Sequence, residues 1–357
     1  MVFDPATEMM KCPACARTEQ VAIPAGAHVA AESFEAAMRN DPSQLEKLSE
    51  TALQVTCPGC GSVIEFQPPQ VAGACPFCAA QIVTQPVAAD ARIAPSAVLP
   101  FHVDKRAAST AFRGWISSRW FAPGALERLA KPDVIRGVYI PFWTYDADTY
   151  SEYRGSRGDH YYETAWVNET DDEGNSRQVQ TQVQRTRWFP TAGRVTNQFD
   201  DVLITATKAL NTKRLQELEP WDLKEIKPYE PQFLSGFEAQ RYQLPLQDGF
   251  ELAKREMQGQ IDSTVRQAIG GDEQTVDNIA TNYMNIMFKH ILLPVWVGAY
   301  RFDGRVFQVV VNARTAQVKG ERPYSIGKIV LLVVAVILLL IVIISLASMG
   351  GGRHRYR

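Results

Sequence analysis

Apolar residues recur every three to four positions in four segments of the chain, a spacing typical of amphipathic helices. Residues 30–53 follow this pattern with a break at Asp41-Pro42, which predicts a helical hairpin or a kinked helix. Residues 248–269 and 274–290 are each predicted to form one helix. The fourth predicted helix follows Phe101 and places these side chains on one face: Ala108, Phe112, Trp115, Ile116 and Trp120.

Strands are predicted where β-branched and aromatic residues gather between turn-forming residues. The segments are 138–144, 161–168 and 177–188, and the acidic run at 171–175 is typical of a hairpin tip between the last two. Val179, Thr181 and Val183 alternate with glutamines, which predicts one covered face and one solvated face. A final hairpin is expected at 295–302 and 305–318. This order of helices and antiparallel hairpins predicts an α+β fold.

The most apolar segment of the chain, residues 329–349, has Ser345 and Ser348 as its only polar residues. As a helix it would be roughly 31 Å long, enough to cross the hydrocarbon core of a bilayer. We therefore predict a single-pass anchor in the cell membrane, followed by a basic tail. No apolar signal segment follows Met1, so we expect the bulk of the chain in the cytoplasm. The positive charges on the two sides of the helix are nearly balanced and barely favour either orientation.

All six cysteines occur as Cys-Pro-x-Cys pairs, a pattern suited to metal binding in a reducing compartment. Cys57-Cys60 and Cys75-Cys78 are separated by fourteen residues, close to the spacing by which two knuckles hold one Zn²⁺ tetrahedrally. We predict a zinc ribbon with a structural ion bound by Cys57, Cys60, Cys75 and Cys78. Disulfides are the competing use, and a cytoplasmic location argues against them.

Each knuckle needs a sharp turn, for which Gly61 can adopt the left-handed conformation. Ala16 and Ala79 stand where the other two knuckles favour glycine, so a left-handed turn there would cost about 1 kcal/mol. Either these turns are strained or their geometry differs.

The first pair, Cys12 and Cys15, is only half a site. Phe3-Asp4-Pro5 precedes Cys12 by the same number of residues that separates Phe66-Gln67-Pro68 from Cys75, so the N-terminus resembles the second half of a ribbon. Three readings stay open for this possible second, incomplete site: an upstream partner pair lies outside the chain, the knuckle is vestigial, or its metal is shared with His28 or another chain.

The domain organisation follows from these features. The predicted parts are a half zinc ribbon at 1–28, a helical insertion at 29–54, a zinc ribbon at 55–84, a linker at 85–100, an α+β domain at 101–324, the transmembrane helix at 329–349 and the basic tail at 350–357.

Charge argues against nucleic-acid binding by the complete ribbon. The net charge is −2, and no lysine or arginine lies between Gln54 and Ala91, whereas phosphate contact needs such residues. Lys11 and Arg17 flank the half ribbon and keep a nucleic-acid role as the alternative. A neutral ribbon is better suited to contact with a protein partner.

Enzymatic motifs are missing from the sequence: there is no phosphate-binding loop, nucleophile elbow or paired-histidine zinc helix. Asp146-Ala147-Asp148 could bind a cation but is more simply a solvated strand edge. His102, His160 and His290 are scattered and are expected to be surface or satisfied core residues. A pocket lined by Trp143 and Trp296 would favour an enzyme, whereas a solid core there would not. We predict a protein without catalytic activity.

Besides the cysteine pairs, five further motifs carry a resemblance to a known family. They are residues 101–105 (FHVDK), 120–123 (WFAP), 139–143 (YIPFW), 228–229 with 233–237 (PY, FLSGF), and 289–296 (KHILLPVW). With the cysteine pairs, they make nearly the whole chain resemble bacterial TFIIB-type zinc-ribbon membrane proteins. Members are often labelled primosomal protein N′ or replication-restart helicase, but this chain lacks a helicase nucleotide loop. The resemblance implies a membrane-associated adaptor or scaffold, acting with stomatin-like or flotillin-like proteins in envelope maintenance.

Overall fold

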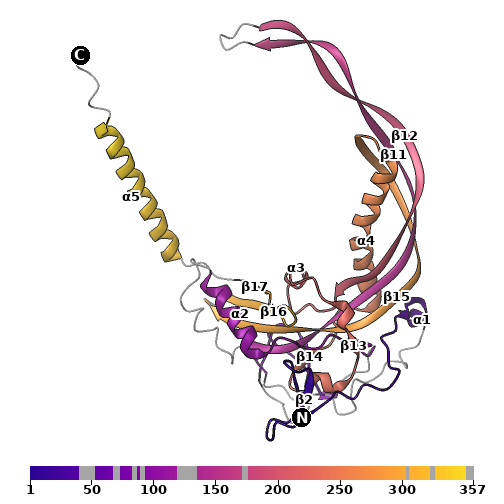
Figure 1. Ribbon diagram of the computed structural model, residues 1–357, viewed down its shortest axis with the longest axis vertical. Coiled ribbons are helices and arrows are strands. Elements are labelled where there is room, and N and C mark those ends of the chain that lie inside the picture. Colours follow the sequence, from indigo (N-terminus) through magenta and orange to yellow (C-terminus); the bar gives the residue numbers. More distant parts are fainter. Residues whose placement is uncertain are drawn as a thin grey trace.

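The computed structural model describes residues 1–39, 53–66, 73–82, 87–88, 93–118, 135–170, 176–302, 305–321 and 326–350. It is a mixed α/β structure with two long projections, an arm of β-strands and a C-terminal helix (Figure 1). Both projections leave a body that contains the N-terminus.

Three long strands form the arm: β11 (Ile135–Thr170), β12 (Ser176–Thr205) and β15 (Glu273–Phe302). The central strand is β11, which pairs antiparallel with both neighbours. Helix α4 (Leu246–Ile269) lies along the inner side of the curved arm and buries one apolar stripe against it (Figure 1). The stripe consists of Leu246, Phe250, Ala253, Met257, Ile261, Val265 and Ile269. Its three- to four-residue spacing is the one that predicted this helix.

Short strands extend the same sheet into the body. The strand order β13-β10-β15-β11-β14-β6-β5-β9 places the arm strands at the centre, with β4 pairing to β15 and β16–β17 continuing from β15. These strands are β4 (Glu32–Ser33), β5 (Leu53–Thr56), β6 (Val63–Phe66), β9 (Val87–Ala88), β10 (Ala97–Val98), β13 (Lys227–Pro228), β14 (Glu238–Gln240), β16 (Arg305–Asn312) and β17 (Val318–Gly320).

Two small sheets carry cysteine pairs. One comprises β1 (Val2–Asp4), β2 (Met9–Lys11) and β3 (Thr18–Glu19), and the other comprises β7 (Gly73–Ala74) and β8 (Gln81–Ile82). The remaining short elements are α1 (Phe34–Arg39), α2 (Lys105–Ser117), α3 (Thr212–Gln216), and the 3₁₀ turns η4 (Leu223–Glu225) and η5 (Pro231–Leu234).

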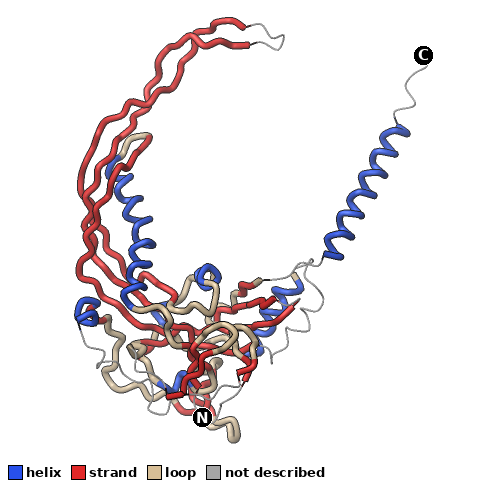
Figure 2. The backbone as a smooth tube through the Cα atoms, turned by 180° about the vertical axis from the view of Figure 1, so that it is seen from behind, coloured by secondary structure: helices blue, strands red, loops and turns tan. Residues whose placement is uncertain are grey.

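Helix α5 (Ile326–Gly350) extends away from the body (Figures 1 and 2). Its apolar stretch, residues 327–345, is long enough to span a membrane and has no part buried against the rest of the chain. Leu331 is 72% exposed. A core helix of this composition would be buried, so α5 lacks the packing that such a helix would have in a soluble body.

The helix predicted at 274–290 is wrong, because these residues belong to strand β15. Two β-bulges explain the error. One skips Asp277 and the other lies beside Asn285, and each shifts the inward-facing positions by one residue. The residues facing α4 are therefore Val276, Ile279, Tyr283 and Ile286, spaced 3, 4 and 3 apart like a helical stripe.

The strands predicted at 138–144, 161–168 and 177–188 are present but lie within β11 and β12, which are much longer. The prediction of one covered face at 177–188 is wrong: Val179 and Val183 are only half-buried and Thr181 is exposed, because α4 ends before this part of the arm. The hairpin tip at 171–175 lies outside the described residues.

Other expectations are met in part. The helix after Phe101 ends as α2 at Ser117 with Ala108, Phe112 and Ile116 buried, while Trp120 lies outside the described residues. Of the helical segment predicted at 30–53, Phe34–Arg39 form α1 and Glu32–Ser33 form β4, while residues 40–52 lie outside the described residues. The final hairpin forms from β15 and β16. The linker predicted at 85–100 instead contributes β9 and β10 to the sheet, because Ala97, Val98 and Leu99 are fully buried beside β15.

Ile261 of α4 is completely buried against the arm, so its replacement should destabilise this unit. For Ile261→Ala we expect the free energy of unfolding to fall by about 2–5 kcal/mol, because the substitution removes buried methylenes and leaves a cavity. Denaturant unfolding of the detergent-solubilised chain measures this. Gln258→Ala, at an exposed position of the same helix, is the control and should change stability by less than about 0.5 kcal/mol.

Candidate metal centre

Four cysteine sulfurs from two turns of the body form a cluster: Cys57, Cys60, Cys75 and Cys78, all within 4.8 Å of one another. The Sγ atoms of Cys57 and Cys78 are 3.5 Å apart, and those of Cys60 and Cys75 are 3.7 Å apart. A tetrahedral ion with metal–sulfur bonds of about 2.3 Å needs sulfurs about 3.8 Å apart, whereas a disulfide needs about 2.0 Å. All four are free thiols. The predicted ligand set is therefore brought together with a spacing that fits a metal ion.

Both turns have the same backbone. Gly61 N donates to Cys57 O and Ala79 N donates to Cys75 O, each at 2.9 Å. Gly61 and Ala79 have φ of 71° and 56°, so both are left-handed. The prediction for Gly61 is confirmed, and Ala79 carries the strain that its Cβ imposes. The backbone amide of Gly59 also points at Cys57 Sγ, at 3.4 Å.

The cluster is part of the protein's main hydrophobic core. Cys57, Cys75, Cys78 and Phe77 are buried in one cluster with residues of β10, β11, β15 and β16, and only Cys60 is exposed. Strand β6, which follows Cys60, pairs with β14, which pairs with β11. The knuckles are thus held in the body by sheet pairing and by apolar packing.

Two glutamines of the body attach one knuckle each. Gln243 Nε2 donates to Gly61 O at 3.1 Å, and Gln308 Nε2 donates to Phe77 O at 2.6 Å and to Ala209 O at 3.0 Å. Sequence reasoning did not identify Gln243 or Gln308, because no local pattern marks a glutamine whose partner lies more than a hundred residues away. Their effect is to fix both halves of the metal site to the same framework.

Without a bound cation, the thiols favour different protonation states. The Cys75 thiol hydrogen-bonds to Cys60, which raises the pKa of Cys75 and lowers that of Cys60 to about 4. Burial raises the pKa of Cys78 to about 11. A bound cation would instead favour four thiolates, so metal binding at this site releases protons.

The pair Cys12 and Cys15 forms a third turn of the same kind. Ala16 N donates to Cys12 O at 2.9 Å with Ala16 φ at 57°, as Ala79 does with Cys75. The flanking hairpins match as well: Met10 pairs with Glu19 as Gly73 pairs with Ile82, an offset of 63 residues at every position. The predicted likeness between the N-terminus and the second half of the ribbon is confirmed in backbone structure.

This third turn is not a complete site among the described residues. Cys15 is exposed, and no His, Cys, Asp or Glu of the described chain joins the pair to make a three-ligand group within 4.8 Å. His28, one of the predicted alternatives, is exposed and bonds to Gly26 O. Metal sharing with His28 is therefore not the arrangement seen.

The Asp146-Ala147-Asp148 motif divides between two surroundings. Asp146 lies with Asp200 and Asp201, and the Lys289 ammonium is 2.6 Å from Asp201 and 3.6 Å from Asp146. Burial raises the pKa of Asp146. Asp148 instead accepts from Gln198 and Asn285. A lysine already supplies the positive charge in the aspartate group, so we assign it no metal.

The remaining candidate residues lie apart from one another. His102 is exposed, and His160 bonds to Glu273 at 2.8 Å on the arm. Trp143 and Trp296 are buried in two different core clusters. Their indole N–H groups donate to Leu244 O and Val103 O.

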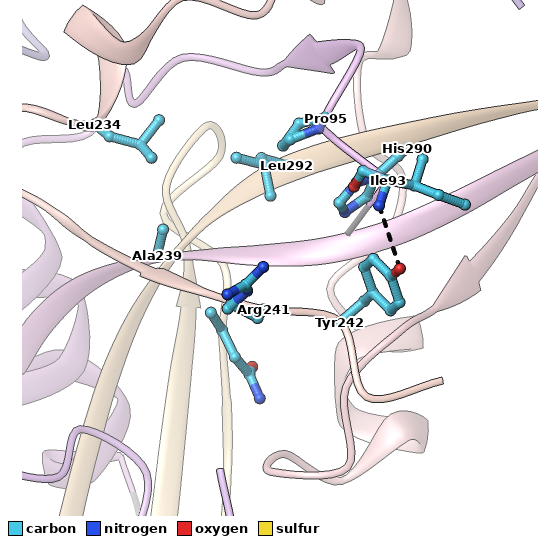
Figure 3. A pocket seen from close by; sticks show the side chains of 9 residues that line it. Ile93, Pro95, Leu234, Ala239, Arg241, Tyr242, His290 and Leu292 are labelled. Carbon is cyan, nitrogen blue, oxygen red and sulfur yellow. Dashed lines mark hydrogen bonds between the residues drawn. The ribbon is translucent and has the colours of Figure 1, made fainter. Parts of the chain in front are cut away.

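His290 lies in the body beside a small cavity (Figure 3). The cavity has a volume of about 10 Å³, which matches a single water molecule and excludes a cofactor. His290 Nδ1 donates to Ile93 O, and the ring lies against Trp143 and Tyr242. Burial lowers the pKa of His290 to about 4. The ring is therefore neutral at pH 7 and serves as a core residue.

Taken together, fold and site define a mixed α/β chain with a four-cysteine cluster in its core and an apolar C-terminal helix. The chain is similar to the uncharacterized protein YdjG of Bacillus subtilis (strain 168), with 25% identity over 267 residues that cover 73% of each chain. No family model matches the chain. No solved structure matches it either.

Loss of one buried ligand should abolish metal binding. For Cys75→Ser we expect the metal content of the purified chain to fall by about one ion per chain. The body should also lose stability, because the free energy of binding a structural metal adds to the free energy of folding. Elemental analysis and limited proteolysis measure the two effects. Cys15→Ser, at the exposed half site, is the matched control and should leave proteolytic resistance of the body unchanged; equal loss in both variants would contradict the assignment.

The buried His290 should make the chain sensitive to mild acid. Its pKa is about 4 when folded and about 6.5 when unfolded, so between these values only the unfolded state binds the proton. Stability should therefore fall as pH drops from 6.5 to 4, by on the order of 3 kcal/mol. His290→Gln should remove this part of the pH dependence while keeping a donor for Ile93 O. Unfolding at several pH values checks it, with exposed His102→Gln as the control; an unchanged slope in His290→Gln would disprove the claim.

Proposed function

We propose that this chain is a membrane-anchored zinc-ribbon adaptor without catalytic activity. Its body is held at the cytoplasmic face of the cell membrane by α5, and it recruits protein partners there. The observation that carries the proposal is the pairing of an unburied apolar helix with a large body.

The membrane assignment rests on the energetics of α5. The side chains of residues 329–344 would each gain on the order of 1 kcal/mol or more on leaving water, and no other part of the described chain covers them. A bilayer accepts such a helix because all its backbone groups bond within the helix. The reduced cysteines support a cytoplasmic body, since six thiols without disulfides suit a reducing compartment.

Zinc is the metal that the cluster fits best. Four thiolates favour a soft or borderline cation, and a tetrahedral four-sulfur set is typical of structural Zn²⁺. We propose a closed site, because four cysteines complete a tetrahedral ligand set and three of them are buried. We assign the ion a structural role: it joins β5–β6 and β7–β8 to the core of the body.

The sequence led us to expect the ribbon as the docking module. Cys57, Cys75 and Cys78 are buried and both turns are attached by Gln243 and Gln308, whereas Pro58, Gly59 and Cys60 are exposed, so only part of the ribbon lies on the outside of the body. We therefore propose that partners contact the outside of the body and the arm. In line with the family resemblance, a membrane scaffold protein of stomatin or flotillin type is the partner we propose.

The anchor can be tested by two charges placed within it. Val334→Arg with Leu338→Arg should release the chain from alkali-washed membranes, because each arginine costs roughly 2.5–3.5 kcal/mol at the centre of a spanning helix. The control Val334→Leu with Leu338→Val keeps the helix apolar and should stay in the membrane fraction. Release of the unmodified chain by the alkaline wash would rule out a spanning helix.

The adaptor role needs a separate experiment. The full chain is purified from detergent-solubilised membranes and compared with the double-arginine variant and with an unrelated protein carrying the same α5 sequence. A scaffold protein enriched by the full chain alone supports recruitment at the membrane. No protein enriched above the unrelated control would refute it.

A further inference from the structure

The outer part of the arm has only two strands. Strand β15 begins at Glu273 opposite Gly158, so residues 159–170 of β11 and 176–187 of β12 continue beyond it as a hairpin, here called the distal ribbon (Figure 1). Helix α4 also ends before this point. A two-stranded hairpin without a third strand or a covering layer is marginally stable in water. The distal ribbon therefore lacks partners that the rest of the arm has.

Hydrogen bonds show which backbone groups of β11 face the open edge. Gly158 O accepts from Asp272 N at 2.8 Å, and His160 N donates to Asp272 Oδ2 at 2.7 Å, so both point to the side of β15. Direction alternates along a strand, so Tyr162, Thr164 and Trp166 present their N–H and C=O groups to the same edge. No strand of the described chain occupies it. The edge is a direct continuation of the line of β15.

This edge has little of the usual protection against pairing: Glu163 is the one charged residue between Tyr161 and Val167. Natural edge strands carry lysine, proline or bulges, and residues 159–170 contain no lysine or proline and pair with β12 without a register shift. Tyr162 is 65% exposed and Trp166 is 67% exposed, both on one face of the ribbon. Large exposed aromatics beside an open edge mark an interaction surface.

We propose that two copies of this chain join through this edge, with their β11 strands antiparallel about a two-fold axis at Thr164. Pairing covers residues 161–167 of each copy, because Asp272 and Glu273 already occupy the edge at Gly158 and His160. In this segment the strand order is β12-β11-β11-β12. Thr164 faces the partner's Thr164, and Tyr162 faces the partner's Trp166 twice. The outward-pointing N–H and C=O groups of these residues bond to each other. Tyr161 faces the partner's Val167 on the opposite surface of the sheet.

The register follows from the sequence. A two-fold axis between antiparallel strands places one residue opposite its own copy, so neighbouring registers centre on Glu163 or Ala165. Centring on Glu163 sets two carboxylates directly opposite each other, which destabilises the pair. Centring on Ala165 sets Tyr162 opposite Asn168 and loses the aromatic pairs. Within the free segment 161–167, the Thr164 register forms two Tyr–Trp contacts and sets Glu163 opposite Ala165, so this segment is complementary to itself, as a symmetric dimer requires.

A cross-link at the axis tests the proposal. Thr164→Cys is introduced into the full chain, in a background with Cys12→Ser and Cys15→Ser, and oxidised in native membranes. Thr164 and Gln182 lie opposite each other in one hairpin, both exposed on the same face, so Gln182→Cys is the matched control. Facing Thr164 positions would be about 5.5 Å apart, within disulfide reach, so this variant should give at least about tenfold more covalent dimer than the control. Gln182 positions would be three strand spacings apart, roughly 14 Å. Equal dimer in both variants, or none, would overturn the proposal.

A second measurement separates strand pairing from insertion of the distal ribbon into lipid. Tyr162→Lys with Trp166→Lys should reduce Thr164→Cys dimer at least about tenfold, because it places like charges opposite each other. Trp188→Lys removes an exposed aromatic of β12 on the same face and should leave the dimer unchanged. If Trp166 fluorescence is quenched by brominated lipids in nanodiscs, measured as the difference from Trp166→Phe, the ribbon tip lies in the membrane and the dimer proposal is wrong.

Discussion

The antiparallel pairing of β11 with β15 is the interaction on which the rest of the structure depends. It runs from Ile135 opposite Gly298 in the body to Gly158 opposite Glu273 on the arm. In the body it gives β10, β14 and β16 an edge to pair with, and through β14 it positions the ribbon strand β6. On the arm it forms the surface that α4 covers. The body, the arm and strands β5 and β6 beside Cys57 and Cys60 therefore share one sheet.

The four-cysteine cluster packs into the same hydrophobic core as residues of this sheet. Phe77 lies between two ligands in sequence and is completely buried among residues of the body. The two turns present Phe77 and Ile82 to the core, so an ion bound by the four thiolates would stabilise the turns and the body together. The same packing leaves less of the ribbon free for docking than a separate zinc domain would have.

The sequence predicts the elements whose patterns are local and misses those set by distant contacts. The stripe of α4, the two cysteine turns and the apolar α5 are each visible in a short window of residues. The β15 error shows the opposite case, because bulges beside Asp277 and Asn285 give a strand the spacing of a helix. The four ligands follow from spacing alone. Gln243 and Gln308 cannot be predicted in this way, because a side chain that bonds to a carbonyl far away in the sequence produces no local sequence pattern.

The arm is covered by α4 only up to about Gly158. Below this point α4 covers one face, and Gly155 and Gly158 allow close approach of Thr275 and Trp188. Above it the same strands continue without another element of the described chain on either face, although an isolated hairpin gains little from extra length. Strand pairing through the β11 edge would replace water at the open N–H and C=O groups and cover Tyr162 and Trp166 in a single step. The proposed dimer would then explain both the exposed aromatics and the open edge of β11.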